Sequence, residues 1–137
     1  MSEIVVGYDG SDGAKAALNR AVGLAKELGD KLVIVFGYTP RGYGGGAVAD
    51  HREAVKEIGE KVTREAAETV SHAGVDSEVV LVSEKGAEAM NDVATQRKAR
   101  MIVVGTHGES ALKGAMLGST AHTLVHIAET PVLVVRE

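Results

Sequence analysis

Short apolar runs alternate with helical patterns along the whole chain, and this alternation constrains the fold more than any other feature. The runs are rich in Val, Ile and Leu, which is typical of buried strands. They cover residues 3–8, 31–38, 75–82, 101–104 and 131–135. Between them, apolar residues recur three and four positions apart, which predicts helices. The predicted helices cover residues 14–28, 47–73, 86–97 and 119–128.

This order predicts an α/β fold: a single doubly wound, Rossmann-like, five-stranded parallel sheet with helices on both faces. The reason is that a helix between two strands makes a right-handed crossover and leaves the strands parallel. A length of 137 residues suits one domain, residues 1–137. The run at 31–38 is apolar almost throughout, so both of its faces should be covered. The run at 75–82 alternates at its start, which places it nearer an edge.

Local signals mark the predicted helix ends. Ser11 or Asp12 can cap the first helix, and Gly29 supplies its carboxyl-terminal stop. Gly74 is expected to close the second helix, and Ser119 could cap the last one.

Composition excludes several classes of function. Aromatic residues make up 3% of the chain and Trp is absent, which argues against a stacking platform for single-stranded nucleic acid. The net charge of -4 without a basic stripe makes nucleic acid an unexpected partner. No cysteine is available for a disulfide, a thiolate metal site or a nucleophile. No targeting sequence is evident, and no apolar run approaches the ~20 residues of a membrane span. We therefore expect a soluble, cytoplasmic protein.

Glycine-rich loops follow three of the predicted strands, at residues 7–13, 37–46 and 105–119. In doubly wound sheets, ligands bind beyond the carboxyl ends of the strands, where the strand order reverses. Glycines let a ligand approach backbone N–H groups, and a helix amino terminus favours an anion. The loop at 105–119 therefore predicts a phosphate cradle, in which Ser119 and Thr120 donate hydroxyl hydrogen bonds. A plain turn capped by Ser119 is the alternative, and the glycine spacing at the ligand edge favours the cradle. The loop is not a Walker A motif, because Lys113-Gly114 reverses the required order.

The spacing Gly105-x2-Gly108-x9-Gly118-Ser119, the first strand ending Val6 to Ser11 and the last strand Pro131 to Val135 together resemble the universal stress protein family over the whole chain. The G-x2-G-x9-G-[S/T] signature implies the ATP-binding branch of that family. The resemblance implies ATP, alone or with Mg²⁺, or AMP as ligand, and a homodimer through the last strand, Val132–Val135. The expected nucleotide-binding residues are Gly7, Asp9, Gly37, Val104, Gly105, His107, Gly108, Gly118, Ser119 and Thr120.

Individual residues keep simpler alternatives open. Asp9 can accept a hydrogen bond from an adenine amino group or a ribose hydroxyl, or form an Asx turn with the following backbone. His107 can touch ribose or phosphate, or brace the turn. Glu109 beside phosphates is unfavourable unless a divalent cation bridges them, and Lys113 could offset it. No other metal ligand is expected.

Two further patterns resemble known binding motifs, but a simpler interpretation is favoured for each. Gly42-x-Gly44-x-x-Ala47 formally fits a dinucleotide-binding pattern, but a loop that closes over the site as a lid is favoured. His122 and His126 are one helical turn apart, but Thr123 stands where a zinc protease has its Glu, so ordinary helix histidines are expected.

The sequence thus predicts an ATP-binding stress-response or signalling protein, a dimeric module whose surface changes with nucleotide occupancy. The first alternative is a slow ATP-hydrolysing or nucleotidyl-transfer enzyme, for which Lys113 and His107 are the nearby candidates. The second alternative is a dimeric scaffold without ligand.

Overall fold

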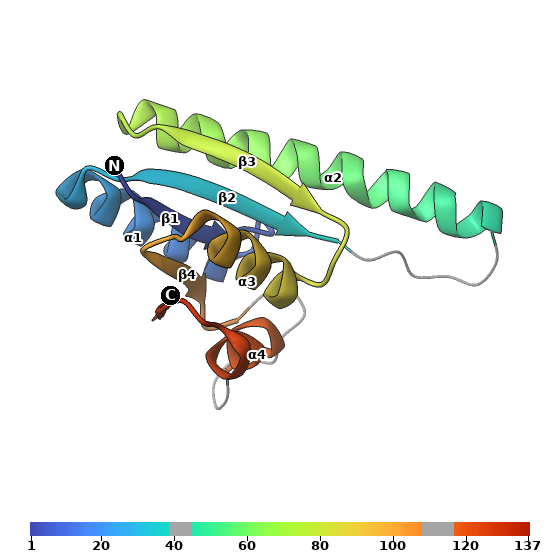
Figure 1. The fold of residues 1–137 in the computed structure, drawn as a ribbon. Helices are drawn as coiled ribbons and strands as arrows, with labels where there is room; N and C mark the ends of the chain where they lie inside the picture. Colours follow the sequence, from blue (N-terminus) through green and yellow to red (C-terminus); the bar gives the residue numbers. More distant parts are fainter. Residues whose placement is uncertain (39–44, 108–116) are drawn as a thin grey trace.

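A computed structural model describes residues 1–38, 45–107 and 117–137, with the side chains of residues 45–52 outside the description. Strands and helices alternate along this part of the chain, as predicted (Figure 1). The strands are β1 (Glu3–Gly7), β2 (Lys31–Gly37), β3 (Ser77–Val82), β4 (Met101–Gly105) and β5 (Val132–Val135). The helices are α1 (Asp12–Leu28), α2 (Gly45–His72), α3 (Gly86–Arg97) and α4 (Ser119–Ile127).

The strands form one sheet in the order β3-β2-β1-β4-β5, and all neighbouring pairs are parallel. The chain runs outward from β1 to β3 and then crosses back to β4, so the strand order reverses beside β1. This confirms the predicted fold class, and it places β3 at an edge as its alternation indicated. By the rule for doubly wound sheets, a ligand is expected beyond the carboxyl ends of β1 and β4.

Each face of the sheet buries its own apolar cluster. On one face, Ile4 and Ile34 pack against α1 and α2, which contribute residues such as Leu18 and Val70. On the other face, residues of the central strands pack against α3 and α4. That second cluster includes Val5, Val33, Val35, Met90, Ile102, Val104, Ala121 and Leu124. The predicted coverage of β2 on both faces is therefore confirmed.

The helix ends match the sequence signals with one exception. The Ser11 hydroxyl oxygen accepts a hydrogen bond from the Ala14 N–H at 3.2 Å and caps α1. Gly29 ends α1 in the left-handed region with φ of 71°, and Gly74 follows α2 with φ of 81°. The exception is Ser119, because the N-cap of α4 is Gly118 and has no side-chain capping bond. The alternative in which Ser119 caps this helix is wrong: Ser119 is its first residue, one position too late for its hydroxyl to cap.

Charged side chains tie the strands together at the amino-terminal edge of the sheet. Arg100 Nε donates to Asp30 Oδ2 at 2.6 Å, and the Asp30 side chain is buried. Arg97 pairs with both Glu3 and Glu78, and Lys31 Nζ lies 3.1 Å from Glu78 Oε1. The hydrogen bond from Arg100 lowers the pKa of Asp30, and the hydrogen bond from Arg97 lowers the pKa of Glu78. These ion pairs fix the edge opposite the expected ligand site.

Within the described residues, no helix combines the length and the apolar character that crossing a membrane requires.

Candidate functional site

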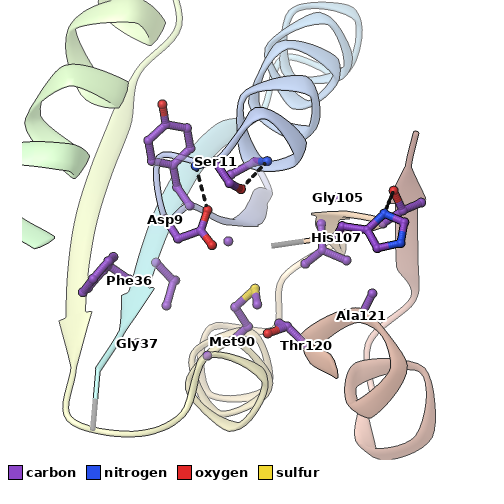
Figure 2. Close-up of a pocket in the computed structure, with 16 residues that line it drawn as sticks. Asp9, Ser11, Phe36, Gly37, Met90, Gly105, His107, Thr120 and Ala121 are labelled. Carbon is purple, nitrogen blue, oxygen red and sulfur yellow. Dashed lines mark hydrogen bonds between the residues drawn. The ribbon is translucent and has the colours of Figure 1, made fainter. Parts of the chain in front are cut away.

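A cavity of about 180 Å³ opens at the carboxyl ends of β1, β2 and β4, where the strand order reverses (Figure 2). The first turns of α3 and α4 close it from the side. The residues that line it are Gly7, Tyr8, Asp9, Ser11, Ala14, Val35, Phe36, Gly37, Gly86, Met90, Val104, Gly105, Thr106, His107, Thr120 and Ala121. The cavity therefore lies where doubly wound sheets commonly bind their ligands.

The floor of the cavity is apolar. Gly7 pairs in register with Val35 on β2, and Val104 of β4 lies on its other side. Both valines are nearly fully buried in the cluster beneath α3 and α4. Met90 from α3 and Ala121 from α4 complete this surface. A flat apolar group could pack against it and lose its contact with water.

Asp9 supplies a carboxylate at the rim of the cavity. Its Oδ1 accepts a hydrogen bond from the Ser11 N–H at 2.9 Å, so the Asx turn considered from the sequence is present. Figure 2 shows the Asp9 side chain turned toward the cavity. One carboxylate oxygen thus shapes the turn, and Oδ2 remains as an acceptor for a ligand hydroxyl or amino group.

Tyr8 and His107 are the other titratable groups of the lining. Burial raises the pKa of the Tyr8 phenol, and the negative charges of Glu65 and Asp9 raise it further. The phenol is therefore neutral at physiological pH. His107 Nδ1 lies 3.1 Å from the Thr106 hydroxyl oxygen, so the imidazole is in contact with its own strand end. Both alternatives for His107, a contact with ribose or phosphate and a brace for the turn, stay predictions.

Close backbone contacts hold the cavity walls together. A β-carbon built on Gly105 would lie 2.5 Å from the carbonyl oxygen of Gly13. A β-carbon on Gly37 would lie 2.7 Å from the carbonyl oxygen of Glu84. Real β-carbons essentially never approach a heavy atom this closely. Gly37 and Gly105 thus have a packing reason to be glycine, beyond any contact with a ligand.

The start of α4 is tied to the end of β4. The Gly118 N–H donates to the Thr106 carbonyl oxygen at 2.6 Å. Gly118 is buried, whereas Ser119 is exposed and Thr120 lies on the cavity wall. The amino terminus of α4, a region of partial positive charge, therefore stands beside the cavity.

Most of the residues predicted from the sequence meet at this cavity. Gly7, Asp9, Gly37, Val104, Gly105, His107 and Thr120 line it. Gly118 and Ser119 do not line it, although Gly118 contacts the lining residue Thr106. Gly108, Glu109, Lys113 and the expected lid residues Gly42 and Gly44 lie outside the described residues.

The sequence reasoning missed several residues of the lining. The sequence placed Met90 only on the inward face of α3, and nothing else in the sequence indicated that it lines the cavity. Ala121 likewise belongs to the apolar pattern of α4. Gly86 and Thr106 lie directly at the ends of elements that face the ligand edge, a position that could have identified them.

The structure also locates the histidine pair. The His122 and His126 rings contact each other edge to face, with centroids 4.8 Å apart, on the exposed side of α4. Across the described ranges, no group of three His, Cys, Asp or Glu side chains is placed to hold a metal ion.

Comparisons with known proteins agree with this fold. The sequence pattern of the Universal stress protein family matches residues 1–136. A universal stress protein of Thermus aquaticus is 37% identical over 140 residues, which cover 97% of each chain. The structure superimposes on universal stress protein UspA from Lactobacillus plantarum with a TM-score of 0.87 and 23% identity, covering 98% of this chain and 97% of that one.

A third similar protein carries a ligand. It is a universal stress protein solved in complex with cAMP, with a TM-score of 0.74 and 29% identity. The match covers 98% of this chain and 96% of that one. The family pattern, the sequence relative and the fold agree along almost the entire chain, and we conclude that this protein belongs to the universal stress protein family.

Proposed function

We propose that this protein binds an adenine nucleotide, ATP in the first place, and acts as a nucleotide-dependent module in a stress response. The observation that carries the proposal is the cavity at the reversal of strand order, with an apolar floor, a carboxylate at its rim and the amino terminus of α4 beside it. The similar universal stress protein that was solved with cAMP supports an adenine nucleotide as the ligand class.

The parts of the site suit the parts of a nucleotide. The base would pack on the floor formed by Gly7, Val35 and Val104. Asp9 Oδ2 would accept a hydrogen bond from a ribose hydroxyl or from the adenine amino group. The volume of about 180 Å³ is below the ~300 Å³ at which most small-molecule pockets begin, so it suits the base and part of the sugar.

The phosphates would lie beyond the cavity, near the start of α4. Backbone N–H groups at a helix amino terminus attract anions, and the Ser119 and Thr120 hydroxyls can donate to phosphate oxygens. In this arrangement Gly105, Gly108 and Gly118 allow the phosphates to approach the backbone. Mg²⁺ would accompany ATP through its phosphates, with Glu109 as the one protein ligand to test.

We propose in addition that the protein is a homodimer through β5. This strand lies at the edge of the sheet and pairs only with β4 within the described chain. Leu133 on this strand is 37% exposed. Pairing of β5 with its copy would cover an apolar edge that otherwise favours aggregation. Light scattering should give twice the chain mass at micromolar concentration, and Leu133→Lys should shift it toward the monomer. A monomeric wild-type protein would contradict the dimer.

The test of nucleotide binding is calorimetric titration of the purified protein with ATP and AMP, each with and without magnesium. Mass spectrometry of small molecules released from the protein gives an independent measurement. We expect saturable binding of an adenine nucleotide and weaker binding of the guanine counterparts. If none of these nucleotides binds under any of the conditions, the proposal fails and a scaffold without ligand is favoured.

The same samples separate binding from catalysis. Phosphoryl transfer needs a positioned base and charge stabilisation around the γ-phosphate. Chromatography of ATP incubated with the protein should show hydrolysis no faster than the background. Hydrolysis above background that is lost in Lys113→Ala or Glu109→Gln would favour the enzyme instead.

A further inference from the structure

A glycine interrupts the row of side chains that forms the cavity floor. Val35, Gly7 and Val104 lie side by side on β2, β1 and β4, and their positions face α3 and α4. Both neighbours of Gly7 in this row carry a branched side chain. Gly7 therefore leaves a notch in the centre of the floor.

The Met90 side chain fills this notch. A β-carbon built on Gly7 would lie 2.4 Å from Met90 Sδ and 2.7 Å from Met90 Cε. Met90 is 4% exposed and packs in the cluster beneath α3 and α4, and it also lines the cavity. Figure 2 shows the Met90 side chain directed from α3 toward the cavity. One side of the thioether thus faces the notch, and the other side faces the cavity.

We propose that Met90 is a specificity-determining residue of the nucleotide site and that it takes this position because residue 7 has no side chain. The proposal rests on the proposed nucleotide binding. The thioether sets the shape of the deep, apolar end of the cavity, where the base would lie. Sulfur packs favourably near an aromatic ring, and methionine adapts its shape to irregular space.

The contact between Gly7 and Met90 predicts which way Met90 moves when Gly7 is replaced by alanine. The new β-carbon meets only the far end of a flexible side chain, so the fold can adjust by moving Met90. The interior around Met90 is close-packed, and the cavity is the open space next to it. Met90 therefore moves into the cavity and reduces the room for the base.

The experiment is a double-mutant cycle on the full chain, with AMP affinity measured by calorimetry. We expect Gly7→Ala to weaken AMP binding about tenfold. The midpoint of thermal unfolding should change little, because the flexible end of Met90 can move aside. In the Met90→Ala background, where the notch is empty, the same Gly7→Ala change should have no further effect. Gly23→Ala and Met101→Ala serve as controls. A β-carbon on Gly23 meets open space, and Met101 is the first residue of β4, at the end of that strand away from the cavity.

A second measurement tests specificity directly. Met90→Ala enlarges the base subsite, so at least one AMP analogue with a methyl, chloro or bromo substituent on the base should gain about tenfold over AMP relative to wild type. A merely structural role for Met90 would weaken all these ligands equally. Equal losses, or an unchanged AMP affinity in Gly7→Ala, would overturn the proposal.

The methyl group of Met90 provides a readout that needs no ligand. In protein with ¹³C-labelled methionine methyl groups, Gly7→Ala should shift the Met90 signal strongly and leave that of Met101 in place. If wild-type protein binds no adenine nucleotide, the proposed function fails, whereas an unmoved Met90 signal rejects the notch itself.

Discussion

Gly13 and Gly105 touch through their backbones, although they come from different elements of the fold. A β-carbon on Gly105 would lie 2.5 Å from the Gly13 carbonyl oxygen, and a β-carbon on Gly13 would lie 2.2 Å from the His107 carbonyl oxygen. The first turn of α1 thus rests directly on the end of β4. This contact sets the position of the backbone that leads into the proposed phosphate-binding loop.

Alanine at either position should destabilise the protein, because backbone atoms cannot move aside as a flexible side chain does. We expect Gly13→Ala and Gly105→Ala each to lower the free energy of unfolding by about 1–3 kcal/mol, measured with urea. Gly23→Ala is the matched control on the same helix, where a β-carbon meets open space. It should raise the free energy of unfolding by about 0.5–1 kcal/mol. A Gly13→Ala variant as stable as Gly23→Ala would contradict the contact.

Two serines at helix starts should separate stability from binding. Ser11→Ala removes the cap of α1 and should lower the free energy of unfolding by about 1 kcal/mol. Ser119→Ala removes no capping bond and should change it by less than about 0.5 kcal/mol, while weakening nucleotide binding. Urea unfolding and calorimetry on both variants measure the two effects. An equal loss of stability in both variants would show that Ser119 supports its helix in another way.

The two oxygens of Asp9 should be separable by substitution. Asp9→Asn retains the acceptor for the Ser11 N–H but replaces Oδ2 with an NH₂ donor. We expect its stability to stay within about 0.5 kcal/mol of wild type and its AMP affinity to fall about tenfold. Asp9→Ala should lose both the acceptor for the Ser11 N–H and the acceptor for the ligand, and its free energy of unfolding should fall by about 1 kcal/mol. If Asp9→Asn binds AMP as wild type does, Asp9 acts in the turn alone.

Asp30 should make stability depend on acid pH. Its pKa is lowered chiefly by the hydrogen bond from Arg100, so folding favours the ionised form. This contribution is fully present above the unfolded-state pKa of about 3.9 and is lost as the pH falls through the lower folded-state pKa. Urea unfolding at a series of pH values from neutral to strongly acidic should show this loss.

Arg100→Ala should reduce that pH dependence and lower stability near neutral pH by about 1–3 kcal/mol, since the buried carboxylate loses its partner. Lys26→Ala, which removes an exposed positive charge from α1, is the control and should leave the pH profile unchanged. A profile of Arg100→Ala that matches wild type would assign the pH dependence to other groups.

The sequence predicted the elements well because each depends on local patterns. The strands, the cap at Ser11 and the stop at Gly29 are all encoded within a few residues. The rule that ligands bind beyond the carboxyl ends of parallel strands was enough to predict that the ends of β1, β2 and β4 meet. For that reason Asp9 and Gly105 were predicted at the site.

The residues that were missed depend on contacts between distant segments. Met90 meets Gly7 only because α3 crosses β1 at one particular register, and no periodicity encodes that register. Gly13 was read as part of a turn, whereas the structure gives it a contact with His107. The last helix begins at Ser119 as predicted, but its N-cap is Gly118, so the alternative in which the Ser119 hydroxyl caps the helix is wrong by one residue.

The ion pairs at the amino-terminal edge of the sheet have a consequence for engineering. Every ion pair found in the described ranges joins residues near the amino ends of the strands, on the side away from the cavity. The ligand edge is instead lined by glycines, hydroxyl groups and apolar side chains, together with Asp9 and His107. Ligand preference can therefore be redesigned at one end of the strands while the charged clamp at the other end still sets their alignment.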